Sequence, residues 1–191
     1  MRNIVNINKD WLFVKDTTDI SLREGLQVNL PHCWNNEDGY DGGNDYFRGS
    51  CLYYKKLNKA DLPASDLYYV EIQGANSSAD FYANGKKLAH HDGGYSTWRV
   101  NITEELKDEC EIAIIVDNSA NNTVYPQMAD FTFYGGLYRN VNIIAVSSSH
   151  FDLTYYGGSG IQITPIIDLD NANVEVQVKT SFSCEVVVIY T

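Results

Sequence analysis

Ala79-Asp80-Phe81-Tyr82-Ala83-Asn84-Gly85 is the stretch that decides the fold. Its first five positions alternate between two side-chain classes, which is the period of a β-strand with one buried face. The Asn-Gly pair at its end is the strongest short signal for a β-hairpin, because both residues accept the positive φ of a tight turn. The stretch therefore predicts two antiparallel strands joined at residues 84–85.

The same period recurs on both sides of this hairpin. Further strands are predicted at residues 4–7, 11–14, 26–30, 51–57, 68–73, 112–116 and 143–146. The only helical signal is Thr103-Glu104-Glu105-Leu106, about one turn, with Thr103 or Asn101 as its cap. Many short strands with almost no helix predict an all-β antiparallel sandwich, and the want of crossover helices excludes a parallel α/β fold.

Length and charge bound the function. The 191 residues, 44% of them hydrophobic, suffice for one packed domain and part of a second. The formal net charge of −11, from 14 basic and 25 acidic residues, repels nucleic-acid phosphates and anionic membranes. We therefore expect neither nucleic acid nor a membrane as a partner.

The cysteines and the N-terminus restrict the possible functions less than length and charge do. The four cysteines are widely spaced and form no Cys-x-x-Cys pair, so we expect buried thiols rather than a zinc site, with one disulfide left open; they are Cys33, Cys51, Cys110 and Cys184. No apolar run typical of a signal peptide follows Met1. The compartment stays unknown, between the cytoplasm and a bacterial periplasmic or secreted location.

The C-terminal part differs from the rest. Pro165 interrupts the pattern, and residues 166–191 then give two strand-like runs, at 174–179 and 185–190. These 26 residues are too few for an immunoglobulin-like sandwich, which needs about 100. We expect a first domain at 1–165 and the incomplete first strands of a second, immunoglobulin-like domain at 166–191. The alternative is that the two strands complete the first sandwich.

Two loops carry the residues that we expect to bind a ligand. One is the polar loop 35–49, which is too long for a simple hairpin. The other is 130–141, Asp-Phe-Thr-Phe-Tyr-Gly-Gly-Leu-Tyr-Arg-Asn-Val, which holds an acid, four aromatic residues and two adjacent glycines. Gly135-Gly136 allows backbone angles closed to other residues. The aromatic residues offer flat faces of the kind on which sugars stack.

Four stretches together resemble the N-terminal sugar-binding domain of glycoside hydrolase family 2, which holds β-galactosidases, β-glucuronidases and β-mannosidases. They occur in the family's order, and the resemblance covers roughly residues 10–165. Cys33 departs from the acid that the family usually has at that position. Residues 125–127 and 155–158 favour the β-galactosidase branch. The four stretches are 30–34 (Leu-Pro-His-Cys-Trp), 46–56 (Tyr-Phe-Arg-Gly-Ser-Cys-Leu-Tyr-Tyr-Lys-Lys), 79–86 followed by 91–96, and 130–141.

The resemblance implies a jelly-roll sandwich of the galactose-binding type, followed in the full-length enzyme by an immunoglobulin-like domain and a catalytic TIM barrel. In this family two glutamates of the barrel perform retaining hydrolysis of the glycosidic bond. Neither glutamate can be located here. The parent protein is thus expected to be a glycosidase, with no catalytic residue in this chain and no activity of the chain alone.

The resemblance also implies the site residues. Asp130 matches the acid that contacts sugar hydroxyls and, in some β-galactosidases, a monovalent cation. A carboxylate suits this role because it accepts bidentate hydrogen bonds. Asn44 and Asp45 lie where the family presents another polar residue to the substrate. The alternatives are that Asp130 caps a turn or pairs with Arg139, and that Asn44 and Asp45 belong to a solvated turn.

Other conspicuous residues are interpreted as structural. We expect Trp34 and Trp98 in the core, and Arg48 and Arg139 as ion-pair partners. His90-His91-Asp92 is rejected as a zinc site, because neighbouring residues of a strand point to opposite faces.

Two hypotheses remain, beside an adhesion or scaffold sandwich that nothing but the fold class supports. The first is the sugar-binding part of a β-galactosidase-like retaining glycosidase, with the β-glucuronidase and β-mannosidase branches left open. The second is a freestanding, non-catalytic carbohydrate-binding module. The first implies a β-galactoside-type glycan and the missing barrel as partners, and leaves open a homo-oligomer. It makes no cofactor certain, and leaves open a monovalent or divalent cation in the full-length enzyme.

Overall fold

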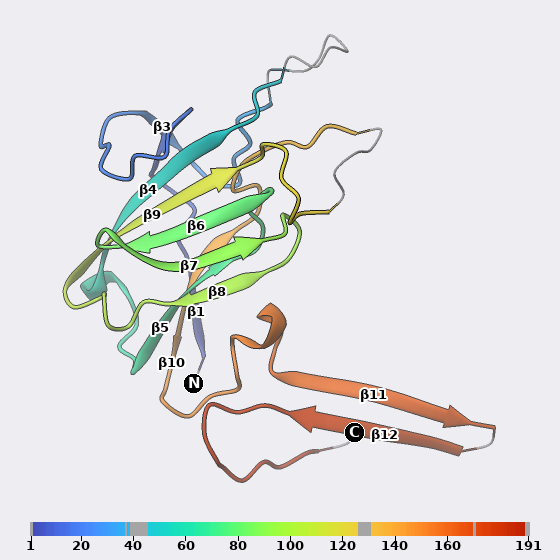
Figure 1. Cartoon of the computed structure of the whole chain (residues 1–191). Helices are drawn as coiled ribbons and strands as arrows, with labels where there is room; N and C mark the ends of the chain where they lie inside the picture. Colours follow the sequence, from blue (N-terminus) through green and yellow to red (C-terminus); the bar gives the residue numbers. More distant parts are fainter. Residues whose placement is uncertain (1, 37, 39–45, 126–130, 170, 190–191) are drawn as a thin grey trace.

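The computed structural model describes residues 2–36, 38, 46–125, 131–169 and 171–189. These residues form antiparallel strands with little else (Figure 1). The strands are β1 (Asn3–Asn6), β2 (Trp11–Val14), β3 (Leu26–Val28), β4 (Ser50–Asn58), β5 (Leu67–Ile72), β6 (Ser78–Ala83), β7 (Lys86–Asp92), β8 (Trp98–Asn101), β9 (Glu109–Asp117), β10 (Val141–Val146), β11 (Ile161–Asp168) and β12 (Asn171–Val178). Two short 3₁₀ helices, η1 (Lys59–Asp61) and η2 (Tyr155–Gly157), complete the set within these ranges. No helix in the described ranges is long and apolar enough to cross a membrane.

Two sheets form the sandwich. One has the strand order β1-β10-β5-β8 and the other β3-β2-β4-β9-β6-β7. All of their pairings are antiparallel. The all-β antiparallel sandwich expected from the alternating pattern is therefore confirmed.

The central hairpin forms where the sequence predicts it. Strand β6 pairs with β7, and Asn84 and Gly85 join them with φ values of 49° and 80°. The Thr103 segment is a single turn, in which the Leu106 amide donates to the Ile102 carbonyl over 2.8 Å. Asn101 caps this turn, since its Oδ1 accepts from the Thr103 amide over 2.9 Å.

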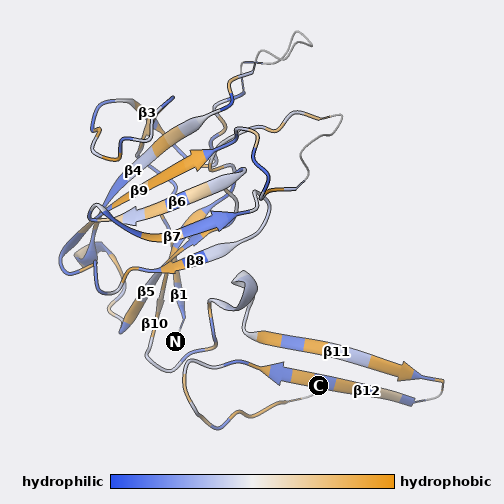
Figure 2. Cartoon of the chain, in the orientation of Figure 1, coloured by the Kyte–Doolittle hydropathy of each residue, from blue (hydrophilic) through white to orange (hydrophobic). Residues whose placement is uncertain are grey.

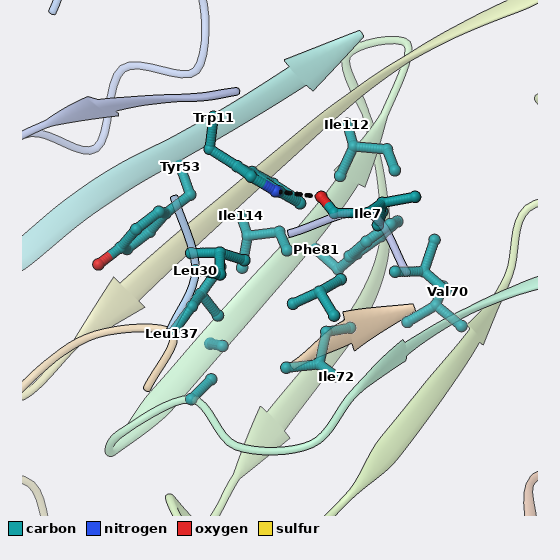
Figure 3. Close-up of a cluster of buried hydrophobic side chains, with 14 of the residues drawn as sticks. Ile7, Trp11, Leu30, Tyr53, Val70, Ile72, Phe81, Ile112, Ile114 and Leu137 are labelled. Carbon is teal, nitrogen blue, oxygen red and sulfur yellow. Dashed lines mark hydrogen bonds between the residues drawn. The ribbon is translucent and has the colours of Figure 1, made fainter. Parts of the chain in front are cut away.

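The core lies between the two sheets (Figure 3). Phe81 and Ile114 of the six-stranded sheet meet Val70 and Ile72 of the four-stranded sheet there, and all four are fully buried. Burying one such side chain contributes about 1.5–3 kcal/mol. The indole Nε1 of Trp11 donates to the Ile7 carbonyl over 2.7 Å, so this polar atom of the core is also paired. Trp34 and Trp98 are each 7% exposed, which confirms them as core residues.

Outer faces of the sandwich are also partly buried. Strand β9 is orange over most of its length in Figure 2, because Ala113 and Ile115 add to its inward-facing isoleucines. These two residues pack with Leu52 under the segment that holds Ile20 and Leu22. A simple apolar-in, polar-out alternation therefore does not describe the central strands.

The C-terminal segment differs from its prediction in two ways. Pro165 lies inside β11, opposite Val174, rather than between two strands. Both strands of this two-stranded sheet are edges, where a residue without an amide hydrogen is tolerated. Residues 182–189 form no strand, since a β-branched run needs a neighbouring strand to pair with. The hairpin projects from the sandwich (Figure 1), and the division at residue 165 stays a prediction.

The cysteines are free. Cys51 and Cys110 are buried as expected, and burial raises the pKa of each thiol to about 11. Cys33 is half-buried, and Cys184 is exposed.

Candidate functional site

The two loops expected to bind a ligand meet at one end of the sandwich. Tyr46, from the first loop, and Tyr134, from the second, lie with ring centroids 6.4 Å apart in a T-shaped contact. The predicted ligand-binding residues Asn44, Asp45 and Asp130 lie outside the described residues. Their roles stay predictions, but the segments that flank them are in contact. We call this region, residues 34–36, 38, 46–49, 117–125 and 131–139, the loop end.

A pair of buried asparagines joins the loops of this end. Asn35 and Asn118 are both 0% exposed, and Asn118 Nδ2 donates to Asn35 Oδ1 over 3.3 Å. Asn35 Oδ1 also accepts from the Gly135 amide over 2.8 Å, and its Nδ2 donates to the Phe47 carbonyl over 2.9 Å. Asn118 donates to the Phe133 carbonyl over 3.0 Å. Two neutral side chains thus pair with three backbone groups of two segments, which burial would otherwise leave without hydrogen-bond partners.

Steric crowding explains why positions 135 and 136 are both glycine. A Cβ on Gly135 would lie 1.9 Å from the Trp34 ring, and Gly136, with φ 141°, lies against the His32 carbonyl. The Gly136 carbonyl accepts from the Asn76 amide over 3.1 Å, while Asn76 Nδ2 donates to the Tyr134 carbonyl over 2.6 Å. The glycines let the second loop pass tightly over Trp34.

The two arginines bind carbonyl oxygens, not carboxylates, among the described residues. Arg48 Nε donates to the Asn118 carbonyl over 2.8 Å, and its guanidinium carbon lies 5.7 Å from the centroid of the Phe133 ring. Arg139 Nη1 donates to the Tyr95 carbonyl over 2.9 Å. The expected ion pairs are therefore not found among the described residues, where the loop carbonyls need donors that no neighbouring strand supplies. Pairing of Arg139 with Asp130 stays a prediction.

The carboxylates described at the loop end are engaged within it. Asp38 Oδ2 accepts from the Phe47 amide over 3.0 Å. Asp117 accepts from the hydroxyls of Ser50 and Ser119. Burial alone would raise the pKa of Asp117, but these hydrogen bonds outweigh it and lower the pKa. Both side chains therefore hold loops in place.

Exposed aromatic rings form the rim. Tyr125 is 89% exposed, Phe131 51% and Tyr134 41%. A small hollow of about 10 Å³ lies beside Tyr125, and Arg48, Asn76 and Phe133 also line it. Flat rings with a few hydrogen-bonding groups are what a sugar-binding surface needs, since the apolar face of a sugar packs on a ring.

The histidines do not form a metal site. His90 lies between two carboxylates, with Nδ1 2.6 Å from Asp80 Oδ1 and Nε2 3.1 Å from Asp92 Oδ1, and the hydrogen bond with Asp80 raises its pKa. His91 stacks on Trp98 with ring centroids 5.0 Å apart, on the opposite face of β7. Within the described part of the chain, no group of three or more His, Cys, Asp or Glu side chains could hold a metal ion.

Asn35, Asn118 and Asn76 were not singled out from the sequence. Asn35 follows Trp34 directly at the start of a polar loop, and Asn118 follows the end of a strand. Asparagine is common in the turns that follow strands. The sequence position alone therefore does not tell whether such a residue is buried between loops or exposed to solvent.

No family model matches the chain. A solved β-glucuronidase from Facaelibacterium prausnitzii L2-6, called FMN-binding, superposes with a TM-score of 0.82 and 39% identity, over 95% of this chain and 28% of that one. A curated β-glucuronidase from Bacteroides fragilis is 30% identical over 139 residues, which are 72% of this chain and 20% of that protein. A β-galactosidase from Thermoanaerobacterium thermosulfurigenes is 31% identical over 158 residues, 75% of this chain and 21% of that protein.

Sequence and fold thus agree with the resemblance carried by the four motifs. The chain spans between 20% and 23% of the length of the first curated relatives that it matches. It is homologous to one part of the β-glucuronidases and β-galactosidases of glycoside hydrolase family 2.

Proposed function

We propose that this chain is the sugar-binding sandwich of a family 2 glycoside hydrolase of the β-glucuronidase branch, and that its loop end contacts the substrate at the rim of a catalytic domain. The observation that carries the proposal is the 39% identity to a β-glucuronidase over 95% of the chain. The branch differs from the β-galactosidase branch that the motifs at 125–127 and 155–158 favour. Among solved structures, the lower identity of 28% to a putative β-galactosidase from Bacteroides fragilis supports the change.

The proposed role is binding rather than bond cleavage. Retaining hydrolysis needs two carboxyl groups about 5–5.5 Å apart, one on each side of the glycosidic bond. At the loop end Asp38 and Asp117 are both held in hydrogen bonds within the loops. Its described exposed groups include aromatic rings, which suit positioning a sugar for carboxylates supplied by another domain.

Asp130, Asn44 and Asp45 are proposed as the polar contacts to the sugar. Support comes from the two loops that contain them, whose described flanks are joined by Asn35 and Asn118. A carboxylate beside exposed rings would accept hydrogen bonds from sugar hydroxyls while a ring packs on the sugar's apolar face.

Hydrolysis of aryl β-glucuronide, β-galactoside and β-mannoside tests the proposal, measured for the 191-residue chain and for the complete product of its gene. We expect no hydrolysis by the chain, and hydrolysis by the complete product with β-glucuronide as the best substrate. Preference for β-galactoside would return the protein to the other branch. A complete product that binds sugar but hydrolyses none of the three would favour a freestanding binding module.

The site residues have a separate test in the complete product. Asp130→Asn should lower kcat/KM by about tenfold or more, because a hydrogen bond to a charged group contributes about 1.5–3 kcal/mol. Asp61→Asn, at an exposed position of η1, is the matched control and should change nothing. Equal activity of the two variants would assign Asp130 a structural role.

A further inference from the structure

Tyr156 combines backbone strain with exposure. Its φ of 49° and ψ of 29° lie in the left-handed region, which a bulky side chain seldom adopts. The side chain is 88% exposed, so no packing of its own offsets this strain. Strained residues that persist in a fold tend to mark sites with a function.

The loop that holds Tyr156 is anchored on both sides by one buried arginine. Arg99 of β8 pairs with Glu71 of β5, with Nη2 2.7 Å from Oε2 and both side chains at most 7% exposed. Arg99 Nη1 then donates to the Leu153 carbonyl over 2.8 Å and to the Gly158 carbonyl over 2.7 Å. The ion pair thus reaches out of the sandwich and fixes η2, the coil between the sandwich and β11 in Figure 1.

Gly157 brings the loop close to the sandwich. It has φ 63°, and an added Cβ would lie 1.9 Å from the Thr97 carbonyl oxygen. With its neighbours fixed, the Tyr156 backbone has little freedom, and its ring is presented in a preorganised position. Preorganisation lowers the entropic cost of binding a ligand.

A hollow of about 160 Å³ opens beside this ring. The Tyr155 and Tyr156 rings meet in a T-shaped contact with centroids 4.7 Å apart, and Lys179 Nζ lies 4.1 Å from the Tyr155 centroid. Gln162 of β11 and Gln177 of β12, which are partners in the hairpin register, also line it. The hollow is smaller than the roughly 300–1,000 Å³ of drug-sized pockets, so it suits a single ring.

The lining indicates the chemistry of the ligand. Aromatic rings pack against the apolar face of a sugar, side-chain amides donate to and accept from hydroxyls, and an ammonium attracts a carboxylate. Lys179 supplies a positive charge directly beside these rings. A hollow of about 160 Å³ is small for a nucleotide, so a single acidic sugar suits it better.

We propose that this hollow binds a uronic-acid unit of an oligosaccharide. Tyr156 stacks on the sugar ring, Gln162 and Gln177 bind its hydroxyls, and Lys179 pairs with its carboxylate. The hollow shares no residue with the loop end, so it is a second carbohydrate contact whose existence does not depend on Asp130.

An NMR titration of the 191-residue chain tests the site. The probe is a hyaluronan tetrasaccharide, which alternates glucuronic acid and N-acetylglucosamine, and the neutral comparison is chitotetraose. We expect shifts of the amides of residues 153–162 and 177–179 with the acidic probe, and about tenfold weaker binding of the neutral one. Lys179→Gln should remove this difference. A preference that survives the substitution would overturn the role of Lys179.

Tyr156→Gly separates binding from folding. Glycine accepts a φ of 49° without strain, so this variant should lose binding at the hollow by about tenfold while its unfolding temperature does not fall. Leu169→Gly is the matched control, since Leu169 has φ 47° and is 96% exposed. This variant should relieve the same backbone strain and bind the sugar as the wild type does. Tyr156→Phe retains the ring and should retain binding.

Three results would overturn the proposal. One is wild-type affinity of Tyr156→Gly, and another is the absence of any shift with the acidic probe. The third is a set of shifts confined to residues 131–139, which would place the sugar at the loop end and leave the proposed function intact while removing the second contact.

Discussion

The two aromatic loops of this molecule are held by buried polar networks of opposite kinds. The loop end depends on Asn35 and Asn118, two neutral amides that share hydrogen bonds with each other and with loop backbone. The η2 loop depends on Arg99, a full charge whose partner Glu71 is equally buried. Both networks do the same work, which is to satisfy the backbone of a loop that crosses the end or face of a sheet.

The difference lies in what happens when one member is lost. Removing an amide leaves neutral groups without partners, which costs about 1–3 kcal/mol for each buried group. Removing one member of a buried ion pair leaves an uncompensated charge, which costs about 3–5 kcal/mol. Substitutions in the neutral network should therefore lower the free energy of unfolding less than those in the ionic network. Only the ionic network should make that free energy depend on pH.

The largest expected effect is that of Arg99→Ala. It should lower the free energy of unfolding by about 3–5 kcal/mol, because Glu71 stays buried and the carbonyls of Leu153 and Gly158 lose their donor. Denaturant unfolding measures this. The control is Arg2→Ala, since Arg2 is 37% exposed and 3.9 Å from the same carboxylate, and it should cost at most about 1 kcal/mol. Similar losses for the two variants would remove the distinction between the networks.

Asn118→Ala should cost less, about 2–3 kcal/mol, because only the Phe133 carbonyl and the Gly49 amide lose their partner and no charge is stranded. The Phe47 carbonyl keeps its hydrogen bond from Asn35. Thermal or denaturant unfolding gives the value, and Asn58→Ala, at the exposed cap of η1, is the comparison at a solvated site. A loss as large as that of Arg99→Ala would show that the neutral network is no more tolerant than the ionic one.

The sequence predicts the sheets better than it predicts these networks. Alternation and the Asn84-Gly85 turn locate the central hairpin, because period and turn chemistry are local properties. Asn35 and Asn118 are 83 positions apart, and no local pattern tells a buried amide from a turn residue. Nor does the local pattern show that Pro165 lies in a strand. It interrupts the alternation, but β11 is paired on one side only and tolerates it.

The site was predicted only in part, for a similar reason. The glycine pair and the aromatic residues marked the second loop correctly as a place of close packing and exposed rings. The sequence did not show that Trp34 is the surface on which Gly135 packs. It also gave Arg48 and Arg139 carboxylate partners, whereas the described contacts are to carbonyl oxygens, which every loop offers in abundance.

One glycine from each loop sharpens the comparison on steric grounds. Gly135→Ala should cost about 1–3 kcal/mol, because its Cβ would overlap the buried Trp34 ring. Gly158→Ala should be neutral within about 0.5 kcal/mol, since the nearest atom to its Cβ is 3.4 Å away and its φ is an ordinary −81°. Both are measured by unfolding. A neutral Gly135→Ala would mean that the loop end can move away from Trp34 and is not rigidly packed on it.

The smallest expected effect is a dependence on pH that only the ionic network shows. Burial would raise the pKa of Glu71, but hydrogen bonds from Asn142 and Arg99, together with the Arg99 charge, outweigh it and hold the pKa below its ordinary value of 4.5. A carboxyl with a lowered pKa in the folded state contributes stability that is present above its unfolded pKa and is lost as the pH falls through the folded pKa.

The difference in stability between the wild type and Glu71→Gln should therefore be constant above about pH 5 and shrink below it. Asn118→Ala should instead stay parallel to the wild type at every pH. Unfolding series at several pH values decide the point, and a constant gap between the wild type and Glu71→Gln down to the acid limit would show that the Glu71 carboxylate contributes no net charge interaction to the η2 loop.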